Sequence, residues 1–196
     1  MRLWDSPDQI GQRGPAWSPD SNWIAYYSLH DRKPAILRIK VGAGTAPELV
    51  AYTHTLQAPA WSPQGDLIAF RDGEQMRVVS PDGKENRVVS QSGWVASGWS
   101  TDGGSLFGIA LDEKRHVVLK RITMATGREA VLSDLGQVPA AFDLATAQGT
   151  YWFRNFSAHP NGKSFLTSVY RMQVHLWLMQ DFDRPRRLLS SLFQGK

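Results

Sequence analysis

The sequence predicts an all-β protein, a β-propeller of four-stranded antiparallel blades, and two observations support this fold class. A Trp-Ser phrase recurs at Trp17, Trp61 and Trp99, and a weaker copy follows at Ala158, so the copies are 44, 38 and 59 residues apart. Seven residues after each of these positions lies an apolar residue of a short apolar segment: Ile24, Ile68, Leu106 and Phe165. A period of roughly 40–50 residues is typical of propellers and solenoids, because one small sheet cannot bury its own faces.

The residues after each tryptophan favour a tight hairpin turn. In Ser-Pro-Asp-Gly, proline presets φ, aspartate bonds back to the backbone, and glycine accepts a positive φ. The first copy departs from this pattern with Ser21-Asn22 where glycine is expected, and we expect Asn22 to take the left-handed conformation. The similar phrase Ser80–Gly83 follows no tryptophan, so we interpret it as a turn within a unit.

A second hairpin follows in every unit, which gives four strands per repeat. We expect its strand pairs at 35–40 and 48–51, 76–80 and 86–90, 117–123 and 129–132, and 174–179 and 187–189. The blades then cover about 15–53, 57–92, 95–133 and 150–190. Evidence for helix is weak, since the best segment, 140–147, is short and uncapped.

Four blades are thus visible in one propeller domain spanning 1–196, and residues 1–14 are expected to supply the last strand of a preceding blade. We favour a larger propeller with further blades upstream over a ring closed by an N-terminal strand. An incomplete ring exposes strand edges and apolar faces, so in that case we expect a homodimer.

The composition narrows the function classes. The chain has 196 residues, 42% of them hydrophobic, a net charge of +4 and no cysteine, which excludes disulfides and thiolate metal sites. The basic cluster 184–187 fits a solvated strand end, so nucleic-acid binding is not expected. No apolar run spans a membrane and the start has no hydrophobic leader, so we expect neither membrane insertion nor a signal peptide in this chain. The compartment, periplasm or cytoplasm, depends on the parent protein.

No catalytic or metal site is expected. The serines beside the tryptophans lie in hairpins, and the nearest approach to a nucleophile elbow, 98–102, belongs to the repeat itself. No pair of histidines has metal-ligand spacing among His30, His54, His116, His159 and His175. The sequence therefore predicts a protein that is not an enzyme and has no cofactor, and it favours packing between blades as the role of the repeated tryptophans.

One segment breaks the period and carries the candidate binding residues. About 15 extra residues enter between the third and fourth units, within 133–149, and long inter-blade loops often hold binding residues. An aromatic run follows directly, so we predict a binding contribution from Tyr151, Trp152 and Arg154. The alternative is a plain insertion followed by the first strand of the fourth blade.

The phrases Pro15–Asp20 and Pro59–Pro63 resemble the WD40-like Pro-Asp repeat (PD40) of the TolB-type propellers. The ending 174–185 is most similar to the C-terminal propellers of bacterial kinase or winged-helix regulators. This resemblance implies a non-catalytic module that binds a protein or peptide partner, as the sensor or scaffold part of a larger bacterial regulatory protein. The alternatives are the substrate-gating propeller of a serine peptidase and a TolB-like periplasmic assembly protein.

Overall fold

The computed structural model describes residues 13–42, 44–55, 57–94, 96–114, 116–137, 151–158 and 165–171, and all regular structure there is β-strand. The first sheet contains β1 (Arg13–Trp17), β2 (Trp23–His30), β3 (Lys33–Lys40) and β4 (Glu48–Tyr52). The second contains β5 (Ala60–Trp61), β6 (Ile68–Asp72), β7 (Gln75–Val79) and β8 (Asn86–Ser90). The third contains β9 (Ala96–Trp99), β10 (Ser105–Leu111), β11 (His116–Thr123) and β12 (Arg128–Gln137). The described part of the fourth is β13 (Tyr151–Ala158) and β14 (Phe165–Arg171).

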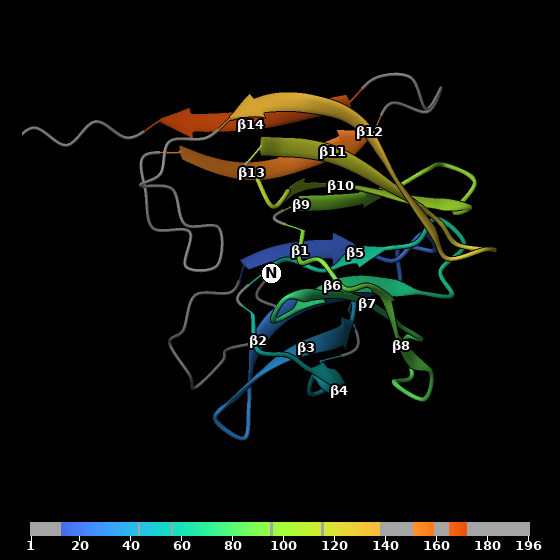
Figure 1. Ribbon diagram of the computed structural model, residues 1–196. Helices are drawn as coiled ribbons and strands as arrows, with labels where there is room; N and C mark the ends of the chain where they lie inside the picture. Colours follow the sequence, from blue (N-terminus) through green and yellow to red (C-terminus); the bar gives the residue numbers. More distant parts are fainter. Residues whose placement is uncertain are drawn as a thin grey trace, which may run out of the picture.

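Each four-stranded sheet is an antiparallel meander in which strands adjacent in sequence pair with each other. The first strands of successive sheets are neighbours, since β5 lies beside β1 and β9, and β13 lies beside β9. The sheets therefore follow one another as propeller blades, with the β2–β4 strands at the lower end of Figure 1 and β12 to β14 at the upper end. The predicted all-β propeller fold is confirmed, and we call the three complete sheets the first, second and third blades.

The observed strands differ from the expected ones most clearly in β12. This strand continues to Gln137, so residues 133–137 belong to the outer strand of the third blade and not to the predicted insertion. Two register irregularities with β11 add residues to β12 without ending the pairing. The expected strands at 174–179 and 187–189, the strand within 1–14 and the short helix at 140–147 lie outside the described residues.

The turns after the tryptophans share one hydrogen-bond pattern. The Ser18, Ser62 and Ser100 hydroxyls each accept the backbone N–H five residues ahead, at 2.9, 3.1 and 2.9 Å, and each donates to an aspartate within the turn. Ser80 makes the same pair of bonds in the β7–β8 turn, which confirms that its phrase lies inside a blade. The hydrogen bonds from the Ser18 and Ser100 hydroxyls are the largest causes that lower the pKa of Asp20 and of Asp102, respectively.

The first of these turns adopts a strained backbone at a residue other than the one we expected. Ser21, and not Asn22, takes positive φ, at 59°, in the place where Gly65 has 80° and Gly103 has 67°. The reason is the turn register, because Ser21, Gly65 and Gly103 each donate N–H to the serine three residues earlier. A side chain in this region costs about 1–2 kcal/mol relative to glycine.

Apolar rows between the blades form the core. The first cluster joins Ala25, Tyr27, Ile36, Val50 and Ala51 of the first blade to Ile68, Phe70 and Val79 of the second, and Trp61 packs against it. A second cluster joins Ala69, Met76 and Val78 of the second blade to Leu106, Ala110, Val118 and Ile122 of the third, together with Trp94 and Trp99. The packing role predicted for Trp61 and Trp99 is therefore confirmed, whereas Trp17 differs, with 55% of its surface exposed.

No helix in the described part of the chain is long and apolar enough to cross a membrane.

Candidate functional site

The meander places the connections of every blade at two opposite ends. One end, which we call the linker face, carries the described linker residues 53–55, 57–59 and 91–94 and the β2–β3, β6–β7 and β10–β11 turns. The other end, the turn face, carries the Trp-Ser turns and the outer hairpin turns. Because a rigid sheet frame holds both sets of loops, either face can present side chains in fixed positions.

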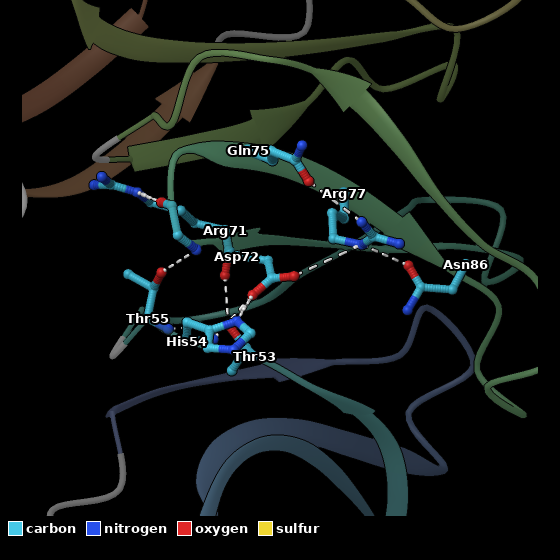
Figure 2. Close-up of polar contacts among 9 residues, drawn as sticks. Thr53, His54, Thr55, Arg71, Asp72, Gln75, Arg77 and Asn86 are labelled. Carbon is cyan, nitrogen blue, oxygen red and sulfur yellow. Dashed lines mark hydrogen bonds and ion pairs between the residues drawn. The ribbon is translucent and has the colours of Figure 1, made fainter.

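A polar cluster begins at the linker face where the first blade joins the second, and it extends along β7 to Asn86 at the turn-face end of β8. Figure 2 shows it: three residues of the linker after β4 lie against the β6–β7 hairpin, and Asn86 closes one side. We call this set the rim cluster, and it consists of Thr53, His54, Thr55, Arg71, Asp72, Gln75, Arg77 and Asn86.

Two threonines fix the linker to the hairpin by reciprocal bonds. The buried Thr53 hydroxyl donates to the Arg71 carbonyl at 2.7 Å, and the Gly73 N–H donates to the Thr55 hydroxyl at 2.7 Å. The Thr55 N–H also donates to the Thr53 hydroxyl at 3.1 Å. The linker and the hairpin therefore satisfy some of each other's polar groups, which fixes the linker against the second blade.

His54 lies between these two threonines, and its ring is exposed to solvent. Its backbone N–H and its Nδ1 both contact Asp72 Oδ1, at 2.9 and 2.8 Å, while 87% of the side chain is exposed. An ionised carboxylate only accepts, so Nδ1 carries a proton and Nε2 offers a lone pair when the ring is neutral. The imidazole is therefore held in one orientation and presented outward.

The two arginines of the rim cluster point to opposite sides of the second blade, since Arg77 pairs with Phe70 and Arg71 pairs with Met76. Arg71 is buried, and its guanidinium binds the Gly73 carbonyl at 2.7 Å and Glu74 at 3.0 Å on the side of the third blade, next to Gly93. Arg77 is partly exposed; its Nε donates to Asn86 at 2.9 Å and lies 4.0 Å from Asp72. An oriented imidazole beside a partly exposed guanidinium suits hydrogen bonding to carboxylate and carbonyl groups of a ligand.

A second polar site joins the second and third blades further out. Lys120 Nζ lies 2.6 Å from Glu129 Oε1 and donates to the Ser92 hydroxyl at 3.0 Å, while the Ser90 hydroxyl donates to Glu129 Oε2 at 2.5 Å. Burial alone would raise the pKa of Glu129, but the hydrogen bonds from Lys120 and the serines and the Lys120 charge outweigh it and lower the pKa. The carboxylate is thus held ionised between two blades.

An open cavity of about 320 Å³ adjoins this ion pair. It is lined by Val88, Val89, Ser90, Gln91 and Glu129. Its wall combines apolar methyl groups with one carboxylate, one amide and one hydroxyl, and the cavity is open to solvent.

The predicted binding residues lie on another blade. Tyr151, Trp152 and Arg154 belong to β13, the first strand of the fourth sheet, where Tyr151 pairs with Arg171 and Trp152 with Tyr170. Their side chains lie outside the described structure, so their binding role stays a prediction. The rim cluster and the cavity are formed by residues of the first three blades.

The histidines within the described structure are separated from one another. His54 pairs with Asp72, His116 Nδ1 lies 2.6 Å from Asp134, and His30 lies 3.7 Å from Asp31. Among the described residues, no group of three or more His, Cys, Asp or Glu side chains could hold a metal ion. His159 and His175 lie outside these residues.

Sequence reasoning missed both polar sites. The sequence contains one signal for the rim cluster. Thr-His-Thr follows an outer strand, and Asp-Gly marks the hairpin turn that this linker contacts. The Lys120–Glu129 pair left none, because the two residues lie on neighbouring strands and meet only through the β11–β12 register. Trp94, which is fully buried in the linker after β8, was also missed, since it does not belong to the repeated phrase.

No family model and no curated protein matches this chain. Solved structures do match. TolB from Acinetobacter baumannii aligns with a TM-score of 0.64 and 19% identity over 84% of this chain and 39% of that chain. A putative TolB from Agrobacterium tumefaciens aligns with a TM-score of 0.58 and 20% identity, over 84% of this chain and 60% of that chain. An oligogalacturonate lyase in complex with manganese aligns with a TM-score of 0.55 and 14% identity, over 82% of this chain and 47% of that chain.

These likenesses establish the fold. They support the TolB-like propeller fold that the Pro-Asp phrases indicated. At identities of 14–20%, they do not assign a function to this chain. The chain spans less than two thirds of each of these three proteins.

Proposed function

We propose that this propeller is a non-catalytic module that binds a protein or peptide partner on its linker face, as the sensor or scaffold part of a larger bacterial regulatory protein. The observation that supports this role is the presentation of His54, whose ring is exposed although Asp72 fixes it from below. A side chain that is held in one orientation loses little conformational entropy when a partner binds.

The chemistry of the rim cluster favours recognition. Its threonine hydroxyls are used in backbone contacts between linker and hairpin, and its buried arginine is paired with Glu74. What remains exposed is hydrogen-bonding surface from His54 and Arg77, which matches main-chain carbonyls and carboxylates of a peptide.

A TolB-like assembly protein is the second candidate, because two TolB structures are among the matches. Both candidates bind proteins through a propeller, and they differ in the attached domains and the compartment. The serine-peptidase alternative stays a prediction.

Site-specific photocrosslinking tests the proposed face. A benzoylphenylalanine replaces His54 on the linker face, or Lys84 on the turn face as a control of matched exposure, 87% against 83%. In cells that produce the protein, we expect a discrete protein adduct at position 54 and none at 84. Equal adducts at both positions, or none at position 54, would contradict the proposal.

A further inference from the structure

The cavity beside Glu129 is part of a groove between the outer strands of two blades. Pairing of Val78 with Arg87 and of Met76 with Ser90 places Arg87 and Ser90 on the side of β8 that faces the third blade. Pairing of Ile122 with Glu129 and of Lys120 with Val131 places Glu129 and Val131 on the side of β12 that faces the second blade. Paired residues share one side of a sheet, so these side chains face each other across the junction.

The groove has an apolar floor and an exposed apolar wall. Val88 and Val89 line the cavity and are half-buried, and Val131, on the side of β12 that faces the second blade, has 59% of its surface exposed. The open cavity of about 320 Å³ has room for one or two side chains of a ligand.

The polar groups of the groove are only partly used by the protein itself. The Gln91 carbonyl oxygen accepts from Gln75 at 3.0 Å, so its amide N–H groups are the donors that remain to it. Glu129 Oε2 accepts one bond from Ser90 and lines the cavity, which leaves it a second lone pair. One donor and one acceptor at the same wall match the C=O and N–H of a peptide group.

The charges of the groove select the sequence of such a peptide. Glu129 is neutralised by Lys120, and Asp134 by His116 when that ring is protonated. Within the described structure, the exposed Arg87 at the turn-face end of β8 makes no ion pair, so it is the charge left for a ligand.

We infer that the groove between β8 and β12 is a second recognition site, which binds an extended peptide of a partner protein. An apolar side chain of the peptide enters the cavity between Val89 and Val131, its backbone bonds Gln91 and Glu129, and a carboxylate side chain pairs with Arg87. This site lies at the second junction and takes its ligand from the side of the propeller, and the Gln75–Gln91 hydrogen bond connects it directly to the rim cluster. Its test uses no variant of His54 or Gln75.

Two defined peptides test the site. The probes are acetylated, amidated Gly-Asp-Gly-Leu-Ser-Gly and the same peptide with lysine in place of aspartate, titrated into the ¹⁵N-labelled full chain. We expect backbone amide shifts at positions 88–91 and 129–131. The aspartate peptide should bind about tenfold more tightly than the lysine peptide, a difference of about 1.4 kcal/mol, because lysine replaces an attraction to Arg87 by a repulsion.

Charge reversal at Arg87 provides the decisive comparison. Arg87→Glu is expected to abolish or invert the preference between the two peptides, whereas Arg121→Glu, an exposed arginine on the opposite side of the third blade, leaves it unchanged. Val131→Asp is expected to weaken both peptides. The inference is overturned if neither peptide shifts the groove amides at millimolar concentration, or if wild type binds both equally.

Discussion

The junction between the first and second blades and the junction between the second and third bury similar apolar rows, but their linkers hold them by different chemistry. At the first junction the linker stays polar and binds the β6–β7 hairpin through Thr53 and Thr55. At the second, the linker inserts the fully buried Trp94 into the core, and the Lys120–Glu129 pair joins the outer strands.

This difference separates the repeated part of each blade from the part that is free to vary. The tryptophan rows must face the preceding blade, so they recur. A linker only needs to hydrogen-bond its backbone polar groups and to span from one blade to the next. One linker can therefore carry an exposed recognition surface and the other a core residue. Recognition at the first junction is therefore compatible with a stable core, whereas the second junction depends on its linker for stability.

The largest expected effect tests that dependence at Trp94. Trp94→Ala should lower the free energy of unfolding by about 3–5 kcal/mol, because a fully buried indole leaves a cavity in the second cluster. Urea unfolding followed by fluorescence measures it. Trp94→Phe is the control. It keeps an aromatic ring in the core, and Nε1 of Trp94 has no partner in the described structure, so this variant should lose clearly less, about 1–2 kcal/mol. An equal loss in both variants would contradict this account.

Glu129→Gln tests the polar part of the same junction. We expect a loss of about 1–2 kcal/mol near neutral pH, because the amide cannot pair with Lys120 and the site is partly exposed. The folded-state pKa of Glu129 lies below the ordinary 4.5, so its stabilisation is present above pH 4.5 and is lost as the pH falls through the lower value. Unfolding curves at several pH values should show a gap between wild type and variant that narrows in acid. A gap independent of pH would exclude this linkage.

Thr53→Val tests the first junction, where no side chain of the linker is essential to the core. It removes the bond to the Arg71 carbonyl and keeps the shape of the side chain, so we expect a loss of about 1 kcal/mol. Amide hydrogen exchange should increase at Thr55 and Gly73 while the second junction stays protected. A loss as large as that of Trp94→Ala would remove the contrast between the junctions.

The smallest expected effect is a gain at the first Trp-Ser turn. Ser21→Gly should stabilise the protein by about 0.5–1 kcal/mol, because glycine adopts the positive φ of this position without strain. Gly65→Ser is the matched control with the opposite sign, and a Cβ there has room, since its nearest neighbour is Pro19 at 3.7 Å. Thermal unfolding measures both, and a destabilised Ser21→Gly variant would show that the side chain outweighs the backbone.

Most of the fold and little of the candidate site could be predicted from the sequence. The period, the tryptophans and the Ser-Asp turns are local patterns, so they predicted the blades, the strand order and the packing of Trp61 and Trp99. The rim cluster and the groove depend on contacts between segments that lie 9 to 39 residues apart, such as Thr53 with Arg71 and Ser90 with Glu129. No local pattern encodes such pairs.

The sequence by itself determined which residues repeat, and repetition is sufficient for a propeller because every blade must cover the next one. Tertiary structure alone decided that Ser21 takes the glycine position, that β12 extends to Gln137, and that His54 stands exposed on Asp72. The physical reason is that turn register, bulges and inter-blade hydrogen bonds depend on which strands meet. That choice is made by the packed sheets together and not by any one segment.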